Sequence, residues 1–130
     1  MFHTLARDCA DLLVGGKSAE RSSPAWRQAY RALQHTRVAD VCRTDSNQNS
    51  RKKRVFKKFP TEIQDFGNSF VDLQKKRHAA DYDPLAKPLT YSEVKASISM
   101  ARGAIKRYKS ATKANRRAFA VFVTMDLRAD

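Results

Sequence analysis

Apolar residues recur at intervals of three and four along most of this chain, which is the spacing of an amphipathic helix. The first such stripe covers residues 2–14, and Gly15 and Gly16 follow it, as expected where a helix ends in the left-handed conformation. The second begins at Ser23, an N-cap residue placed before a proline, and extends to about Val41. The first third of the sequence therefore predicts two helices.

The second half of the sequence predicts two longer helices joined by a short, stiff turn. One begins near Pro60 and should end by Asp83, because Pro84 disfavours a helical conformation in the residue before it. The next begins at Thr90, which stands three residues before Glu93 in the pattern of a capping box. The core stripe predicted for this helix consists of Val94, Ile98, Ala101, Ile105 and Tyr108.

Residues 43–59 lack a helical period and are rich in Ser, Asn and charge, which predicts a basic loop that is mobile in part. Two interpretations fit this segment. It is either an arm that follows a phosphate backbone, with Phe56 stacking on a base, or a solvated linker that Phe56 and Phe59 hold against the core. The candidate nucleic-acid-binding residues of this segment are Arg51, Lys52, Lys53, Arg54, Lys57 and Lys58.

Residues 118–127 are apolar on every side, and the chain offers no second strand with which they could pair. We therefore predict a fifth helix, buried between the other helices and a second subunit. Together the elements predict one all-α domain over residues 1–130, an antiparallel four-helix bundle with an additional C-terminal helix. A homodimer is expected from the same apolar segment.

Net charge is the strongest compositional signal, because 26 Lys and Arg residues stand against 13 Asp and Glu residues and leave a net charge of +13. Such an excess attracts polyanions, of which RNA and other phosphate backbones are the commonest. An acidic protein partner is the alternative interpretation of the same surface.

Several classes of protein lack support in the sequence. It has no P-loop, no Gly-x-Ser-x-Gly and no metal-ligand cluster, so no cofactor and no metal are expected. Cys9 and Cys42 have the spacing of neither a zinc site nor a disulfide framework. The first residues do not resemble a signal peptide, and the apolar run 118–125 is far shorter than the ~20 residues of a membrane span. We expect a cytoplasmic protein without a membrane partner.

The third predicted helix places a cation on the line of its own core residues. Ile63, Phe66, Phe70 and Leu73 are spaced three and four apart, and Arg77 continues the series. Asp81 follows four residues later, so the two charged residues can form an exposed or buried ion pair on one face of the helix. Alternatively, Arg77 belongs to a functional site, since a planar guanidinium is suited to binding phosphate.

Two segments resemble the HEPN superfamily of small α-helical proteins. They are "WRQAYRALQH" at residues 26–35 and the pattern "F..L...R..ADYDP" that ends the third helix. The resemblance covers roughly residues 24–110 and is closest to bacterial members with an Arg-x-x-Ala-Asp-Tyr motif. It implies a helical-bundle fold and a homodimer.

The resemblance also implies an activity. HEPN ribonucleases use an Arg followed, one to two helical turns later, by a His, and they cut RNA without a metal through attack by the 2′-hydroxyl. Arg77 occupies the Arg position here, but the residue five places on is Tyr82 rather than a His. His78 or His35 is the better candidate for proton transfer, since a tyrosine is a poor base at neutral pH. The candidate catalytic residues are Arg77, His78, Asp81 and Tyr82.

Two functions follow from these observations. The chain is either an RNA-associated protein of the toxin or defence type, with metal-independent ribonuclease activity, or a non-catalytic module. In the second case its basic surface would dock an acidic protein, such as an antitoxin or a larger effector.

Overall fold

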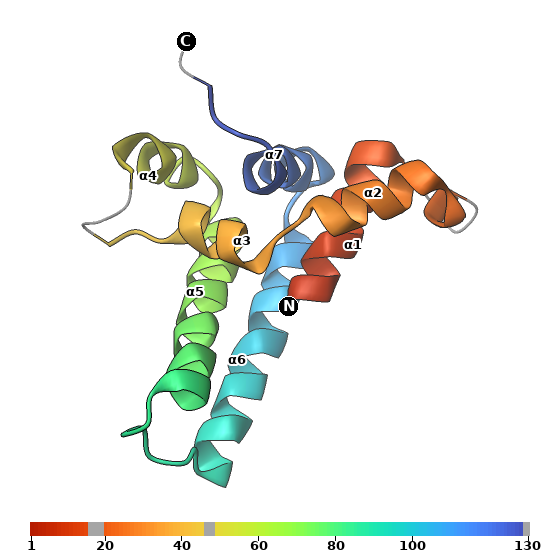
Figure 1. The fold of residues 1–130 in the computed structure, drawn as a ribbon. Coiled ribbons are helices and arrows are strands. Elements are labelled where there is room, and N and C mark those ends of the chain that lie inside the picture. Colours follow the sequence, from red (N-terminus) through yellow and green to blue (C-terminus); the bar gives the residue numbers. More distant parts are fainter. Residues whose placement is uncertain (16–19, 46–48, 129–130) are drawn as a thin grey trace.

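A computed structural model describes residues 1–15, 20–45 and 49–128 of the chain. These residues form seven α-helices and one short 3₁₀ turn, with no strand among them, which confirms the all-α prediction (Figure 1). The elements are α1 (Phe2–Val14), the 3₁₀ turn (Glu20–Ser22), α2 (Pro24–Ala32), α3 (His35–Cys42), α4 (Ser50–Phe56), α5 (Thr61–Tyr82), α6 (Tyr91–Ser110) and α7 (Lys113–Thr124).

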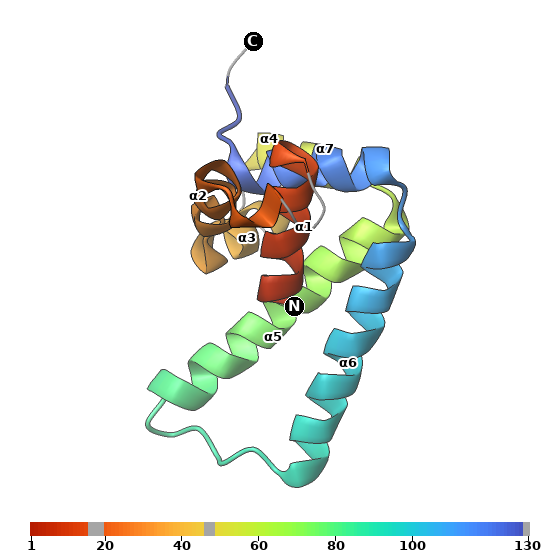
Figure 2. The ribbon, with the colours of Figure 1, turned by 90° about the vertical axis from the view of Figure 1, so that its right-hand side faces the viewer.

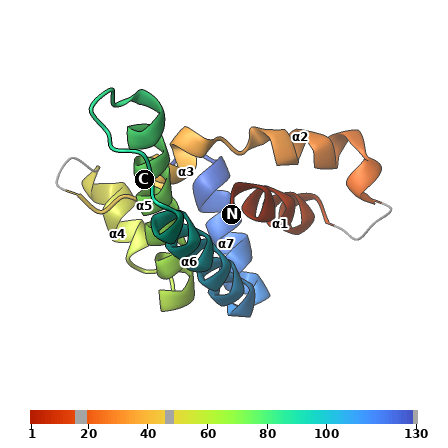
Figure 3. The same cartoon turned by 90° about the horizontal axis from the view of Figure 1, so that it is seen from below.

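The two longest helices, α5 and α6, pack against each other as an antiparallel pair, which we call the α5–α6 hairpin. Figure 2 shows that they converge where α5 begins and α6 ends, and separate toward the loop that joins them. The other helices gather around the converging end. Figure 3 shows α1 lying alongside both α2 and α7, which are its main packing partners.

The core lies at this converging end and is built on large aromatic side chains. Phe66 of α5 and Tyr108 of α6 are fully buried, and their ring centroids are 4.8 Å apart. Phe119 of α7 is also fully buried, 6.2 Å from the Tyr108 ring. Full burial of a side chain of this size stabilises a fold by roughly 1.5–3 kcal/mol before entropy is counted. This cluster therefore holds α7 across the end of the hairpin.

The single helix predicted from Ser23 to about Val41 is wrong, because the chain divides it into α2 and α3. Leu33 and Gln34 have extended backbone conformations, with ψ angles of 131° and 137°. The Leu33 side chain is 4 % exposed and belongs to the core. The break lets α2 pack on α1 while α3 packs on α5. Tertiary packing thus outweighs a sequence that contains no helix breaker at this point.

The prediction of a loop over residues 43–59 is wrong in its second half, which contains α4; residues 46–48 lie outside the described part of the chain. Asn49 caps this helix, because its side-chain oxygen accepts hydrogen bonds from the backbone nitrogens of Arg51 and Lys52, at 2.9 and 3.3 Å. Phe56 is fully buried and stacks on Phe122 of α7. A short, strongly basic helix has too few apolar positions to show a period.

The predicted helix ends are largely confirmed. Gly15 ends α1 with a positive φ of 90°, whereas Gly16 lies outside the described residues. The α5 helix ends at Tyr82, immediately before Asp83. At the start of α6 the capping box is complete, since the Glu93 backbone nitrogen donates to the Thr90 hydroxyl at 3.2 Å and the Glu93 carboxylate accepts from the Thr90 backbone nitrogen at 2.8 Å.

The core stripe predicted for α6 is correct only in its second half. Val94 and Ile98 are 41 % and 49 % exposed, whereas Tyr108 is fully buried. The hairpin diverges over its outer half (Figure 2), so the described residues leave the apolar side chains of helical spacing there largely uncovered. The packing of four long antiparallel helices is not confirmed, because the second predicted helix is split and only α5 and α6 are long.

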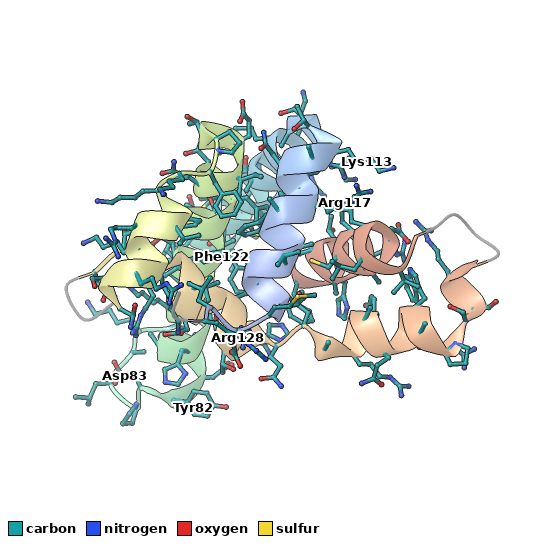
Figure 4. All side chains as sticks on the ribbon, turned by 90° about the horizontal axis from the view of Figure 1, so that it is seen from above. Tyr82, Asp83, Lys113, Arg117, Phe122 and Arg128 are labelled. Carbon is teal, nitrogen blue, oxygen red and sulfur yellow. The ribbon has the colours of Figure 1, made fainter. Side chains whose placement is uncertain are left out.

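The C-terminal apolar segment is helical, as predicted, although α7 begins earlier and ends at Thr124. Figure 4 shows Phe122 on the side of α7 that faces α3 and α4. Much of the apolar surface expected to face a second subunit is instead buried within this chain, leaving Val121, Met125 and Leu127 exposed. The buried residues of α7 are Phe119, Ala120, Phe122 and Val123.

Two glycines of the hairpin should respond in opposite directions to replacement by alanine. A Cβ at Gly67 would lie 2.6 Å from Cζ of the buried Phe56 ring, so Gly67→Ala should destabilise the fold by ~1–3 kcal/mol. A Cβ at Gly103 meets nothing within 4 Å, so Gly103→Ala should stabilise α6 by ~0.5–1 kcal/mol. Chemical denaturation of both variants checks this. Equal stability of the two variants would contradict the close approach of the Phe56 ring to Gly67.

Candidate functional site

A shallow groove of about 280 Å³ lies between the beginning of α3 and the last turns of α5. The four candidate catalytic residues predicted on the third helix all line it, so the structure brings them to one place. We call it the α3–α5 groove. Its lining residues are His35, Gln74, Arg77, His78, Asp81 and Tyr82.

On the α5 side, the groove is lined by two pairs of side chains, and the two residues of each pair are four positions apart on the helix. Nε of Arg77 lies 3.6 Å from Oδ2 of Asp81, and the rings of His78 and Tyr82 are 4.7 Å apart. The side chains of Arg77 and Asp81 are 77 % and 53 % exposed. Arg77 is therefore not a buried cation, and its exposed ion pair contributes only ~0.3–0.5 kcal/mol. A phosphate can compete with Asp81 for the guanidinium at small cost.

On the α3 side, His35 enters the groove from the first turn of its helix. Its ring stacks on Phe2 of α1, with the centroids 3.6 Å apart and the planes 11° apart. Partial burial lowers the pKa of His35, and the nearby Arg77 and His3 lower it further. Because the ordinary pKa of a histidine is about 6.5, the His35 imidazole is neutral at pH 7 and can accept a proton.

The position of His35 beside Arg77 was missed by sequence reasoning. On one continuous helix, His35 points away from the core face and is expected to be a surface or second-interface residue. The break at Leu33 and Gln34 changes that orientation and turns His35 toward α5. The only sequence signal is the presence of a third histidine in a chain with few of them, and this does not locate the residue.

Gln74 lies in the same groove, one turn before His78. Its side-chain Oε1 is buried and has no hydrogen-bond partner among the described residues. Because this oxygen is buried, it is not exposed to a ligand in the groove. The groove thus combines a guanidinium with two imidazoles, which are suited to a polar ligand that carries phosphate.

The basic residues at 51–58 are not part of the groove. In Figure 1, α4 lies near the beginning of α5, whereas the groove is lined by the first residue of α3 and by residues from the last turns of α5. Lys52 forms an ion pair with Asp40 of α3. The burial of Phe56 rules out its stacking on a base and confirms that it anchors the segment to the core. The most exposed cations of the segment are Arg54, Lys57 and Lys58.

Comparisons with protein-family models, with curated proteins and with solved structures find no match for this chain. No cluster of three or more His, Cys, Asp or Glu side chains able to hold a metal ion occurs in the described part of the chain. Within residues 1–15, 20–45 and 49–128, no helix has the length and apolar character needed to cross a membrane.

Replacing Arg77 should change the titration of His35. A positive guanidinium disfavours the protonated imidazole, so Arg77→Gln should raise the pKa of His35 toward its ordinary value. The measurement is an NMR titration of the histidine ring protons. Lys76→Gln removes the same charge one position away, outside the groove, and serves as the control. An unchanged His35 titration in Arg77→Gln would show that the two side chains do not share a groove.

Proposed function

We propose that this protein is an RNA-associated member of the HEPN superfamily, with a HEPN-type helical-bundle arrangement, and that its α3–α5 groove cleaves RNA without a metal. One observation carries this proposal: His35 and His78 come from different helices and line one groove together with Arg77. Two imidazoles and a guanidinium are the groups that such a cleavage requires.

The proposed reaction is an internal phosphoryl transfer. His35, neutral at pH 7, accepts the proton of a ribose 2′-hydroxyl while its oxygen forms a bond to the adjacent phosphorus. Arg77 stabilises the negative charge that grows on the phosphoryl oxygens. The bond from phosphorus to the 5′ oxygen breaks, and His78 has the role of donating a proton to that oxygen. The products are a 2′,3′-cyclic phosphate and a free 5′-hydroxyl.

The remaining groove residues have supporting roles in this proposal. Asp81 orients Arg77 through their contact, and Tyr82 packs against the ring of His78. The chain's net charge of +13 supplies long-range attraction for RNA, with the exposed cations of α4 contributing. Binding should therefore weaken steeply as salt rises, since counterions compete for the phosphates.

Replacement of either histidine should abolish most of the cleavage. His35→Gln and His78→Gln each remove a proton-transfer group, so each should slow cleavage of a mixed RNA by about a hundred- to ten-thousand-fold. Arg77→Gln should slow it similarly, because the developing charge loses its partner. Lys76→Gln, outside the groove, should cleave at the wild-type rate. Gel analysis and detection of cyclic phosphate ends measure the outcome.

This design also separates a true activity from a contaminant. Cleavage that persists at the wild-type rate in all three groove variants cannot come from this groove. RNA binding at low salt without any cleavage would favour the non-catalytic alternative, in which the groove binds but does not react. No binding at low salt would contradict the RNA-associated function itself.

We also propose that two copies associate through the outer half of the α5–α6 hairpin. Several large apolar side chains there are exposed, and residues 78–98 carry three carboxylates and two lysines, a net charge of −1 in a chain of net charge +13. Repulsion between copies is therefore weakest at this surface, which lies next to the groove. The exposed apolar residues are Tyr82, Leu85, Leu89, Tyr91, Val94 and Ile98.

A charge placed on this surface should separate the copies. Ile98 is 49 % exposed, so Ile98→Asp should leave the fold intact and lower the fraction of dimer at micromolar concentration by at least tenfold. Val121→Asp on α7, where the exposed fraction is 41 %, is the matched control and should leave the dimer unchanged. Analytical ultracentrifugation measures both. A monomeric wild-type protein would contradict the proposed dimer.

A further inference from the structure

A second polar site lies at the opposite side of α1 from the core. It is a cleft of about 570 Å³ formed by the first turns of α1, the 3₁₀ turn, the end of α6 and the beginning of α7, and we call it the α1–α7 cleft. Its volume is within the range of small-molecule binding sites. The basic residues that line it are Arg7, Arg21, Lys109 and Arg116, together with His3.

Two carboxylates also line the cleft, and both are already bound by the protein. Asp8 accepts hydrogen bonds from the Tyr108 hydroxyl at 2.6 Å and from a terminal nitrogen of Arg116 at 2.7 Å. Asp11 accepts two from Arg21, with Nε at 3.0 Å. Each carboxylate therefore holds one guanidinium in place. The two arginines are thus oriented by their carboxylate partners before an anion binds, which lowers the entropic cost of binding.

The pKa of Asp11 is consistent with its role in holding Arg21. Burial alone would raise the pKa of Asp11, but hydrogen bonds from Arg21 and Trp26 outweigh that effect and keep its pKa below the ordinary value. Asp11 thus stays ionised and bound at neutral pH, so it neutralises Arg21 and does not take up a proton when an anion enters.

The cleft keeps an excess of two positive charges. Four Lys and Arg side chains line it against two carboxylates, and Arg7 and Lys109 form no ion pair within the described part of the chain. Both side chains belong to exposed residues and can reach a ligand. A phosphate monoester carries about −1.5 to −2 charges at pH 7, which matches this excess better than the single charge of an internal phosphodiester.

We propose that the α1–α7 cleft binds a phosphate monoester, with the terminal 5′-phosphate of an RNA strand as its natural source. The identification of RNA rests on the proposed function, whereas the phosphate site itself does not. The cleft and the α3–α5 groove are joined by two consecutive residues. His3 lines the cleft, and Phe2 stacks on His35 of the groove at 3.6 Å.

Two aromatic rings of α2, those of Tyr30 and Trp26, also lie next to residues of the cleft. Nδ1 of His3 lies 2.7 Å from the Tyr30 hydroxyl, and the Tyr30 ring is 5.3 Å from that of Trp26. Bases of a single strand stack on such rings with little sequence preference. The first bases of a strand whose 5′-phosphate occupies the cleft would stack on these rings, and the contact of Phe2 with His35 marks the route from there to the groove.

The protein contains its own probe for this site. Trp26 is the only tryptophan of the chain, and its indole Nε1 donates a hydrogen bond to Asp11 at 2.9 Å. An anion that enters the cleft changes the electric field at Asp11 and at the Trp26 indole. Tryptophan fluorescence therefore reports occupancy of the cleft.

The experiment titrates the purified protein with inorganic phosphate, with a nucleoside 5′-monophosphate, and with short RNA that carries either a 5′-phosphate or a 5′-hydroxyl. We expect a saturable fluorescence change with phosphate, and RNA with a 5′-phosphate should bind at least fivefold more tightly than RNA with a 5′-hydroxyl. The double variant Arg7→Gln/Lys109→Gln should weaken phosphate binding at least tenfold and abolish the difference between the two RNAs.

Two controls separate this inference from the proposed function. Lys87→Gln/Lys95→Gln removes the same charge from exposed positions on the hairpin and should leave phosphate binding unchanged. Arg77→Gln should eliminate cleavage in the groove without affecting phosphate binding in the cleft. Absence of a saturable change with phosphate, or equal binding by Arg7→Gln/Lys109→Gln, would overturn the site. Phosphate binding without preference for a 5′-phosphate would overturn its assignment to RNA ends.

Discussion

The hydrogen bond from the Tyr108 hydroxyl to Asp8 is the interaction on which the rest of the structure depends. Burial and the adjacent Asp8 carboxylate raise the pKa of Tyr108, so the hydroxyl stays protonated and donates to that carboxylate at 2.6 Å. The Tyr108 ring packs on Phe66 of α5, and Asp8 also binds Arg116 of α7. One side chain thus connects four helices. Loss of the Tyr108 hydroxyl would leave the half-buried Asp8 carboxylate without one of its hydrogen-bond donors, and this would destabilise the fold by about 1–3 kcal/mol.

Confining the core to the converging end of the hairpin has a direct consequence for function. The outer turns of α5 are helical for local reasons, since they make backbone hydrogen bonds within the helix and end in a favourable sequence before Pro84. They bury almost nothing, so Arg77 and His78 remain exposed to solvent. Exposed groups of this kind can react with a large ligand such as RNA, which a deep pocket would exclude.

The helix ends that depend on neighbouring residues were predicted correctly from the sequence. The positions that depend on packing against distant helices were not. The capping box at Thr90, the start of α2 at Ser23 and the end of α5 are set by a few neighbouring residues, and all were predictable. The break at Leu33 depends on burying that side chain in a core built by distant helices, and no local signal marks it. The groove residues differ in the same way. The spacing along α5 predicted Arg77 and its neighbours, whereas His35 faces the groove only because the helix is broken at Leu33 and Gln34.

The histidines of the groove differ in environment, and this difference gives the proposed chemistry its direction. The environment of His35 is the one that suits a base. The stacking of Phe2 on His35 and the charge of Arg77 favour the neutral form of that imidazole. The Arg77 guanidinium is also placed to bind the substrate phosphate. A bound phosphate would screen the positive charge that, together with burial, lowers the pKa of His35. Substrate binding would then increase the basicity of His35 at the moment when a proton must be accepted, and it would do so only when a phosphate is in contact with Arg77.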